Sequence, residues 1–515
     1  MLFTSIEFIC FLLIVASIYY LLPHRFRWIL LLGASYYFYM CWRPEYVLVL
    51  GGVTLVNFWW GKWITRTIDK TRRKRILAFG LCLNIGLLFT FKYLNFFSDS
   101  VKSLLAHFNI FYNFPVFQIL LPVGVSYYTF KTISYLIDVY RENQEPEKHL
   151  GRFALYVSFF PEVTAGPIDR AGKLIPQFLK KVNFDYQQVT DGLKLMAWGF
   201  FKKLVIADRL AVYVDQVYNH LGRYEGIPLI MATYFFTFQI YCDFSGYTDI
   251  AIGAGKIMGF RLMENFNRPY LAKSIAEFWK RWHISFSSWL MDYLFLPIAY
   301  SVSRKIKTPK LLYIKAESWA YQVGIISTML ICGIWHGANW TFVVWGLLHG
   351  FYLAISFITK KARKKIKKRL KIKKNSHFNK VFSLMFTFHL VTFSWIFFRA
   401  RSLPDALYVV KHLFIGLQAF IIKSLESLVF SLSLSPLRLV LDRMGMKPDE
   451  FVIAASALLL LFGLELLTKN TNVTNVFGIF TGKSTWVRWS FYYIIVFYIY
   501  LFGKFSITEF LYAQF

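Results

Sequence analysis

Long apolar stretches separated by short polar segments dominate the sequence. A helix that crosses a lipid bilayer needs about 20 mostly apolar residues, and several stretches meet or approach this length. The stretches that predict membrane helices are residues 5–22, 27–41, 46–61, 76–97, 318–334, 339–359, 380–399, 451–467 and 486–506. With short loops, a chain of this length has room for roughly 11–13 hydrophobic helices, some of which enter the membrane without crossing it.

The apolar pattern is interrupted in two central segments. Glycine, proline and charged residues recur between residues 120 and 177, and again between Tyr241 and Pro297. Irregular backbone at membrane depth is tolerated only where protein or water surrounds it. We therefore expect broken or re-entrant helices buried in both segments, and a reaction chamber in the second.

Composition assigns the chain to a class of protein. Hydrophobic residues make up 57% of the sequence and charged residues 17%, whereas soluble domains are about a quarter charged. The sequence therefore predicts an all-α polytopic membrane protein. We divide it into N-terminal transmembrane helices at residues 1–120, a catalytic core at 121–360, and a basic loop with C-terminal transmembrane helices at 361–515.

Basic residues indicate the orientation in the membrane. The formal charge of +31 is concentrated in blocks beside apolar helices, chiefly Arg66–Arg75 and Lys360–Lys374, rather than spread over a face that would bind nucleic acid. Such blocks stay on the cytoplasmic side and attract anionic lipid headgroups. With Arg66–Arg75 inside, the preceding helices place the N-terminus outside. The amphipathic segment 402–450 is expected to lie on a membrane face.

The five cysteines are scattered and form no pair or cluster with ligand spacing. The sequence therefore predicts neither a disulfide nor a metal site. Cys332 lies one helical turn before His336, so one interpretation of this cysteine is a nucleophile. A small buried packing residue is the more common use of a cysteine in a membrane helix.

Two histidines are the candidate catalytic residues. His336 lies in an apolar stretch, where an ionisable group is costly and marks a functional site by default. His283 lies in a segment that mixes aromatic, basic and hydroxyl residues. A neutral imidazole is suited to remove a proton from a hydroxyl acceptor as the acceptor attacks an acyl carbonyl. The second imidazole would orient the acceptor, polarise the carbonyl or donate to the oxyanion. The competing interpretation is a structural histidine that donates to a backbone carbonyl between tryptophans.

Neighbouring residues extend the candidate site. Gly333 and Gly337 are expected to let a substrate approach the backbone closely, and Asn339 to donate a hydrogen bond. Lys280 and Arg281 are expected to hold phosphates of a carrier donor at the cytoplasmic mouth. The alternative for this basic pair is an interfacial helix with snorkelling cations and an aromatic belt.

Several motifs of the central region occur together in one known family. They are Gly333-Ile-Trp-His-Gly337, Trp345-Gly-Leu-Leu-His-Gly350, Asn265-Phe-Asn-Arg-Pro-Tyr270, Glu277-Phe-Trp-Lys-Arg-Trp-His-Ile-Ser285, Tyr241-Cys-Asp-Phe-Ser-Gly-Tyr247 and Ala165-Gly-Pro-Ile168. In these motifs the chain resembles the membrane-bound O-acyltransferase family, and more narrowly its bacterial alginate O-acetylation branch, over about residues 122–350.

The resemblance implies a ring of helices around a thin, funnelled core. It implies that His336 is the catalytic histidine, that His283 occupies the second active-site position, and that Trp335, Trp282 and Asn265 bind substrate or cofactor. Such proteins take an acetyl group from cytoplasmic acetyl-CoA and need no metal. They pass the acetyl group across the bacterial cytoplasmic membrane to an extracytoplasmic SGNH-type partner, which O-acetylates a polysaccharide.

Two other functions stay open on the sequence. A teichoic acid D-alanyl transfer protein is a related acyltransferase fed by a carrier protein, and it is usually shorter than this chain. A proton-coupled transporter or flippase would use the histidines as a proton relay, but no internal repeat is evident in the sequence.

Three further polar residues are predicted to be structural. His349 is expected to form hydrogen bonds within a helix rich in glycine and tryptophan. Asp243 and Asp249 are expected to pair with buried cations, because an isolated carboxylate in apolar surroundings is costly.

Overall fold

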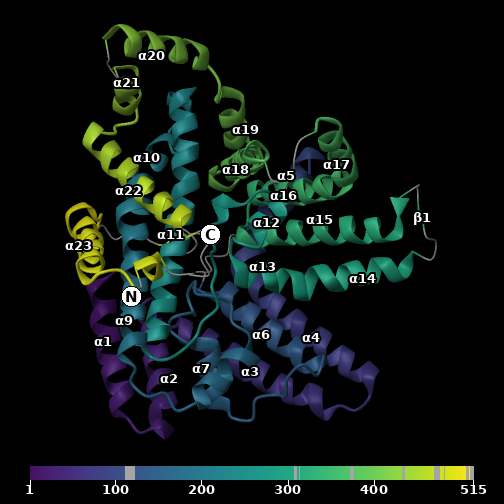
Figure 1. The fold of residues 1–515 in the computed structure, drawn as a ribbon. Coiled ribbons are helices and arrows are strands. Elements are labelled where there is room, and N and C mark those ends of the chain that lie inside the picture. The colour runs from purple at the N-terminus through teal and green to yellow at the C-terminus, as the bar shows by residue number, and fades with distance from the viewer. Residues whose placement is uncertain are drawn as a thin grey trace. The chain divides into compact units, whose positions relative to one another are not determined.

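The computed structural model of the protein describes residues 1–110, 122–306, 310–311, 314–371, 376–431, 435–468, 476–480, 482–505 and 510. Their regular secondary structure is helical, apart from one short hairpin (Figure 1). The chain divides into two compact units. Unit 1 comprises Met1–Met196 and Tyr247–Glu264, and unit 2 comprises Ala197–Gly246 and Asn265–Leu511.

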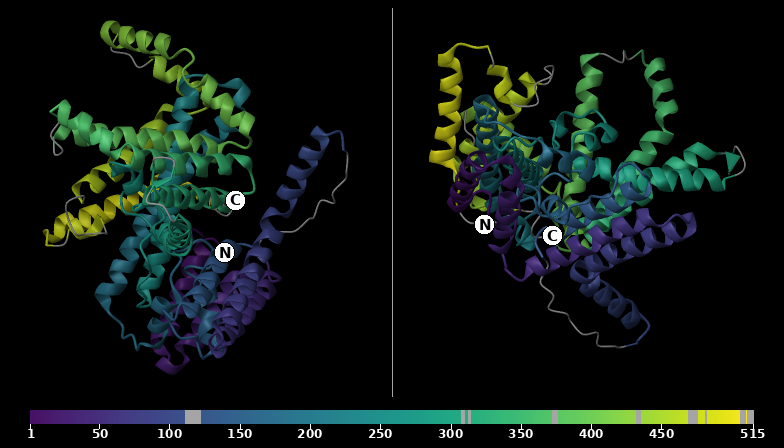
Figure 2. Two further views of the ribbon diagram at one scale, coloured as in Figure 1. Left: turned by 90° about the vertical axis from the view of Figure 1, so that its right-hand side faces the viewer. Right: turned by 90° about the horizontal axis from the view of Figure 1, so that it is seen from below.

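Unit 1 begins with the N-terminal apolar helices. Its elements are α1 (Ile6–Leu21), α2 (His24–Met40), α3 (Tyr46–Arg66), α4 (Lys70–Leu88), the π-helical η1 (Phe89–Tyr93), α5 (Leu94–His107), α6 (Val125–Tyr140), α7 (Leu150–Ser158) and α8 (Ala171–Leu179). The helix α9 (Tyr186–Phe200) follows and leads into unit 2. In Figure 2, α5 extends beyond the other helices of this unit. The predicted N-terminal helices are confirmed, with α4 beginning earlier and α5 ending later than predicted.

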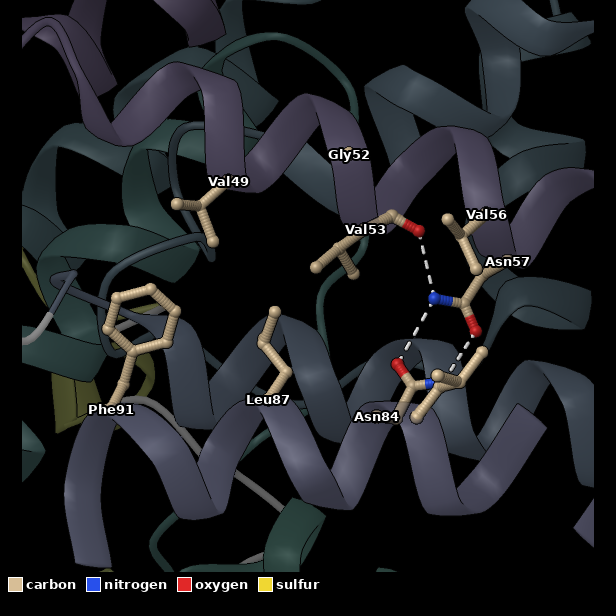
Figure 3. Close-up of a pocket in the computed structure, with 9 residues that line it drawn as sticks. Val49, Gly52, Val53, Val56, Asn57, Asn84, Leu87 and Phe91 are labelled. Atoms are coloured by element: carbon tan, nitrogen blue, oxygen red, sulfur yellow. Dashed lines mark hydrogen bonds between the residues drawn. The ribbon is translucent and has the colours of Figure 1, made fainter. Parts of the chain in front are cut away.

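Buried amides join three helices of unit 1. Asn57 of α3 and Asn84 of α4 exchange hydrogen bonds, each Nδ2 donating to the other Oδ1 at 3.1 Å and 2.8 Å (Figure 3). The Thr132 hydroxyl of α6 donates to Oδ1 of Asn84 at 3.0 Å. The amide pair lies beside an apolar pocket of about 320 Å³. Polar side chains between apolar helices need such partners, and the bonds therefore hold the three helices in one register.

The first interrupted segment is broken and buried, as predicted. α6, α7 and α8 are short, and the loop from Phe159 to Asp169 is buried throughout. Lys131 of α6 and Glu162 of this loop form a fully buried ion pair, with Nζ and Oε2 2.5 Å apart. Gly124 begins α6 with a φ of 76°, and a Cβ there would lie 2.0 Å from the Val163 carbonyl oxygen. Only glycine satisfies both the left-handed backbone and this close approach.

Unit 2 contains the remaining elements. They are the π-helical η2 (Phe201–Ala207), α10 (Asp208–Tyr218), η3 (Leu221–Arg223), η4 (Pro269–Leu271), α12 (Ile275–Trp279), α13 (Ile284–Leu290), the π-helical η5 (Met291–Phe295), α14 (Leu296–Lys305), β1 (Lys310–Leu311), β2 (Ile314–Lys315), α15 (Ala316–His336), α16 (Trp340–Ile358), α17 (Lys360–Arg369), α18 (His377–Arg399), α19 (Leu403–His412), α20 (Leu417–Ser431), α21 (Ser435–Arg443), α22 (Pro448–Leu467), η6 (Val476–Phe480) and α23 (Thr485–Phe502). α14 and α15 run side by side and are joined by the antiparallel pair β1–β2 (Figure 1).

The second interrupted segment is only partly broken. Residues 258–283 are irregular apart from the short elements η4 and α12, as predicted, whereas α13, η5 and α14 continue without a gap from Ile284 to Lys305. The prediction is wrong for residues 241–249, which lie inside one continuous helix, α11 (Ile227–Ile257). The physical reason is that Asp243 has a buried partner: Nζ of Lys203 lies 2.5 Å from Asp243 and 2.8 Å from Asp208. A carboxylate paired in this way needs no break in the helix, and the predicted buried ion pair of Asp243 is confirmed.

Apolar helices confirm a multi-pass membrane protein. Within the described residues, seven helices are long and apolar enough to cross a membrane, or up to eight if a bent pair formed by α19 and α20 is one span. The seven are α3, the continuous segment Lys70–His107, α11, α15, α16, α18 and α22. The 16-residue α1 is also apolar but shorter.

Candidate active site

His283 lies at the turn that begins α13. Its backbone φ of 44° is in the left-handed region, which few residues other than glycine adopt. The residue is 1% exposed, and its Nδ1 lies 3.4 Å from Oδ1 of Asn265. The backbone N–H of Ile284 donates to the Asn265 carbonyl at 2.9 Å and holds the turn. An uncommon backbone conformation at a buried polar residue points to a functional constraint.

Asn265 determines which nitrogen of His283 carries the proton. The backbone N–H of Ser285 donates to Oδ1 of Asn265 at 3.1 Å, and the Ser285 hydroxyl lies 2.5 Å from the same oxygen. A backbone N–H only donates, so the Asn265 atom that faces it is the carbonyl oxygen. That oxygen only accepts, so Nδ1 of His283 is protonated and Nε2 keeps its lone pair. Nε2 is buried, with no hydrogen-bond partner among the described residues.

Burial keeps the His283 imidazole neutral. Removal from water disfavours the charged form and lowers the pKa of His283 to about 3. At physiological pH, His283 therefore presents a neutral ring whose Nε2 accepts hydrogen bonds and does not donate them.

His336 ends α15 and shares aromatic neighbours with His283. The centroid of the Phe286 ring lies 5.0 Å from the His283 ring and 6.0 Å from the His336 ring. The Trp335 ring lies 6.3 Å from His283 and 4.8 Å from His336. His336 is 4% exposed and also contacts the Trp345 ring at 4.9 Å. The structure thus brings the two predicted histidines and Trp335 into one aromatic cluster of unit 2.

Asn339 is the N-cap residue of α16. Its Oδ1 accepts from the backbone N–H of Thr341 at 3.0 Å, which caps the helix. Its Nδ2 donates to the Arg401 carbonyl at 2.7 Å. Because both ends of the amide already have partners, the observed contacts of Asn339 are structural, and its binding of substrate stays a prediction.

The basic pair before His283 lies nearer the surface than the histidines. Lys280 is exposed, and Arg281 is held by Glu277, with Nη2 and Oε1 2.8 Å apart. Trp282 is 1% exposed, and its ring lies 5.1 Å from that of Phe266. Contacts of Lys280, Arg281 and Trp282 with the acyl donor stay predictions.

The expectation for the two glycines beside His336 is wrong. A Cβ on Gly333 would lie 2.3 Å from the Phe342 carbonyl oxygen and 3.0 Å from Cα of Gly346. A Cβ on Gly337 would lie 2.2 Å from the Phe342 ring. The space beside both glycines is filled by α16, so they permit close packing of two helices rather than approach of a substrate.

His349 is a structural hydrogen-bonding residue, as predicted. The indole N–H of Trp279 donates to its Nδ1 at 3.2 Å, so Nε2 carries the proton and donates to the Ser394 hydroxyl at 2.9 Å. Both nitrogens are therefore bonded within unit 2. Cys332 is fully buried in α15, the position that the packing interpretation predicts.

Sequence reasoning did not single out Ser285 and Phe286. Ser285 helps to orient Asn265, and Phe286 is the ring that both histidines contact. Phe398 of α18 also contacts His336, with centroids 5.2 Å apart. Ser285 and Phe286 follow His283 closely along the chain, and this proximity could have identified them as site residues. Nothing in the sequence connects Phe398 to this cluster.

The chain is similar to known proteins over most of its length. Residues 148–398, which include both histidines, match the membrane-bound O-acyltransferase family. The probable alginate O-acetylase of Azotobacter vinelandii is 38% identical over 408 residues, which cover 79% of this chain and 76% of that protein. This chain belongs to the membrane-bound O-acyltransferase family. The predicted family is confirmed, the protein is an O-acyltransferase, and the transporter alternative is set aside.

Other relatives carry related activities in their names. A peptidoglycan O-acetyltransferase of Helicobacter pylori is 34% identical over 390 residues, covering 70% of this chain and 68% of that protein. A teichoic acid D-alanyltransferase of Streptococcus thermophilus is 28% identical over 296 residues, covering 54% of this chain and 68% of that protein.

Proposed function

We propose that this O-acyltransferase moves acetyl groups across the membrane for O-acetylation of an extracytoplasmic polysaccharide. The single observation that supports this most directly is the similarity, over more than two thirds of both chains, to proteins named as alginate O-acetylase and peptidoglycan O-acetyltransferase. The donor is acetyl-CoA on the cytoplasmic side, and an SGNH-type partner outside completes the transfer to the polymer. The membrane is the bacterial cytoplasmic membrane.

His336 is the general base in this proposal. It takes the proton of an acceptor hydroxyl while the hydroxyl oxygen attacks the thioester carbonyl. The new carbon–oxygen bond forms, the carbon–sulfur bond breaks, and the departing thiolate receives the proton. The aromatic rings of Trp335, Phe286 and Trp345 around His336 exclude water, which strengthens electrostatic interactions in the site.

His283 orients the acceptor. Three roles were open for it on the sequence: orienting the acceptor, polarising the carbonyl, and donating to the oxyanion. The Nδ1–H tautomer leaves only a lone pair on Nε2, and a neutral ring with this tautomer cannot donate from Nε2. In this proposal Nε2 of His283 accepts a hydrogen bond from a second hydroxyl of the acceptor, since the proton of the attacking hydroxyl goes to His336, and Asn265 and Ser285 are positioning residues for His283.

A second candidate function is D-alanyl transfer to teichoic acid. The similarity to the Streptococcus thermophilus protein favours it, but this covers 54% of the chain, against 79% for the alginate O-acetylase. The donor separates the two functions. Consumption of acetyl-CoA supports polysaccharide O-acetylation, whereas strict dependence on a D-alanyl carrier protein supports the second.

Replacement of His336 tests the proposal. In proteoliposomes supplied with acetyl-CoA and an SGNH-type partner, we expect His336→Ala to lower CoA release and acetyl ester formation by about 10²–10⁴-fold, the usual contribution of a general base. His389→Ala is the matched control, because His389 is exposed on α18 and bonds only the Met385 carbonyl of its own helix among the contacts described. Both variants should remain folded and inserted in the membrane. Normal esterification by folded His336→Ala would refute the assigned role.

A further inference from the structure

A second cavity lies in unit 2, and its wall contains none of the residues of the histidine cluster. It has a volume of about 530 Å³ and is formed by the start of α12, the second half of α16, α17 and the first half of α18. Its lining includes Ser356, Thr359, Arg363, Lys367, Phe382 and Phe386. We call it the α16–α18 groove.

Along α16 and α17 the groove changes from apolar to basic. Tyr352 and Ile355 come first, the hydroxyls of Ser356 and Thr359 follow at the end of α16, and the cations of α17 come last. On α18, aromatic side chains line the facing wall. α16 and α18 are each long and apolar enough to cross a membrane. Cations at the end of such helices lie at the level of the lipid headgroups.

Arg363 and Lys367, two of the three basic residues that line the groove, are bonded only to neutral groups. Nε of Arg363 donates to the Thr359 hydroxyl at 3.1 Å, and Nη2 donates to the Ser356 hydroxyl at 3.0 Å. Nζ of Lys367 donates to Oδ1 of Asn379 at 2.7 Å. Across the described ranges, neither cation forms an ion pair with a carboxylate. The two positive charges are therefore neutralised by no acid of the described chain and are held in place by short polar contacts.

The apolar wall of the groove is open. Ile355 is 55% exposed, Phe382 59% and Phe386 58%. A soluble phosphate compound would leave these apolar side chains exposed, whereas a lipid chain covers them. The combination of a fixed pair of cations with an adjoining apolar channel matches an amphiphile with an anionic head.

We propose that the α16–α18 groove binds an anionic phospholipid. Its phosphate lies between Arg363 and Lys367, where Nη1 of the guanidinium donates to a phosphate oxygen and the ammonium acts as a point charge. One acyl chain follows the wall formed by Ile355, Phe382 and Phe386. The bound lipid would anchor α17 against α16 and α18.

Native mass spectrometry of the full-length protein in detergent tests this proposal. The probes are phosphatidylglycerol, phosphatidylcholine, inorganic phosphate and CoA. We expect the wild type to retain phosphatidylglycerol in preference to phosphatidylcholine. Removal of both cations in Arg363→Gln/Lys367→Gln should weaken this retention about thirtyfold, since each headgroup contact contributes about 1 kcal/mol.

The matched control is Lys364→Gln/Lys368→Gln. It removes the same charge from the same helix at the same spacing, but neither lysine lines the groove. We expect this variant to bind phosphatidylglycerol like the wild type. Equal losses in the two double variants would overturn the proposal, because only the overall charge of α17 would then matter.

Two further outcomes separate lipid from soluble ligands. Ser383→Trp keeps every charge and fills the apolar channel, so it should weaken phosphatidylglycerol binding. This variant replaces Arg363→Gln/Lys367→Gln as the test if the charge variant does not fold. Loss of CoA or inorganic phosphate binding in Arg363→Gln/Lys367→Gln, with phosphatidylglycerol binding unchanged, would assign the groove to a soluble phosphate ligand and overturn the proposal.

Discussion

A hydrogen bond between His283 and Asn265 decides what this imidazole can do. The bond is long, at 3.4 Å, but its direction is settled by the backbone N–H of Ser285, which donates to the same oxygen. With Nδ1–H committed to that oxygen, Nε2 is an acceptor only. His283 and His336 thus differ in chemistry although both are buried histidines in one aromatic cluster. The first accepts a hydrogen bond, and the second is proposed to accept the proton itself.

Substitution of His283 tests its role as an acceptor. Asparagine keeps an acceptor oxygen in a smaller side chain, whereas leucine keeps the volume and loses the acceptor. We expect His283→Asn to retain at least tenfold more acetyl transfer than His283→Leu, because transfer depends on orienting the acceptor hydroxyl. Initial rates of CoA release at saturating acetyl-CoA measure the difference. Equal activity of the two variants would contradict the assigned role.

The neutral state of His283 also predicts a pH dependence of stability. An imidazole in an unfolded chain titrates near pH 6.5, whereas burial lowers the pKa of His283 to about 3. Below pH 6.5 the unfolded state binds a proton that the folded state does not. The stability contributed by neutral His283 is therefore present above pH 6.5 and is lost as the pH falls towards 3.

We expect the melting temperature of the purified wild type to fall between pH 6.5 and pH 4, and to fall less in His283→Asn. We plot the free energy of unfolding against pH for the wild type and for His283→Asn. The slopes of the two plots should differ by at most about 1.4 kcal/mol per pH unit, the value for the uptake of one proton. Identical slopes would show that His283 is accessible to protons in the folded protein.

The pair α15–α16 shows how small residues hold the site together. Gly333 of α15 and Gly346 of α16 face each other so closely that a Cβ on either would meet the backbone of the other helix. Membrane helices gain no hydrophobic energy from leaving lipid, so close packing of this kind is a main source of their association. His336 is the last residue of α15, and its contact with Trp345 of α16 depends on this packing.

Gly333→Ala should separate α15 from α16. Alanine is normally favoured over glycine in a helix by about 1 kcal/mol, but at Gly333 the added methyl group would lie 2.3 Å from a backbone oxygen. Overpacking of this kind costs about 1–3 kcal/mol. We expect a lower melting temperature and reduced acyl transfer. In the control Gly463→Ala on α22, the methyl group meets no atom within 4 Å, and stability should be kept or raised. A stable, active Gly333→Ala would contradict the tight packing.

The basic segments of the chain predict its orientation in the membrane. Helices that are long and apolar enough to span confirm a multi-pass protein. The block Lys360–Lys374 lies largely in α17, of which Lys360–Arg369 is helical, while its residues 372–374 lie outside the described residues. From the positive-inside rule we propose that this block lies in the cytoplasm and the N-terminus outside.

Cysteine labelling in intact bacteria measures this orientation. In a variant without the native cysteines, we expect Lys365→Cys to resist a membrane-impermeant maleimide until the cells are opened. Thr4→Cys, near the N-terminus, should react in intact cells and serves as the opposite control. Labelling of Lys365→Cys in intact cells would reverse the topology and place the α16–α18 groove at the outer leaflet.

Most helices of the fold follow from the local pattern of apolar residues. Where polar residues interrupt that pattern, the sequence does not show whether the helix breaks. The apolar stretches predicted α1 to α3, α15, α16, α18, α22 and α23 within a few residues, because transfer of a helix into lipid depends on the composition of that helix alone. Whether a polar residue breaks a helix depends on its partner. Asp243 is accommodated in a continuous α11 by Lys203, which comes from another element, and the sequence does not reveal that pairing.

The sequence alone determined the membrane class, the family motifs and the two histidines, since costly ionisable groups in apolar surroundings stand out along the chain. Only the tertiary structure decided that the histidines share Phe286 and Trp335 as neighbours, and that Asn265 determines the tautomer of His283. It also decided that Gly333 serves helix packing. The physical reason is that partition into lipid is a property of a segment, whereas hydrogen-bond direction and close contact belong to pairs of groups distant in sequence.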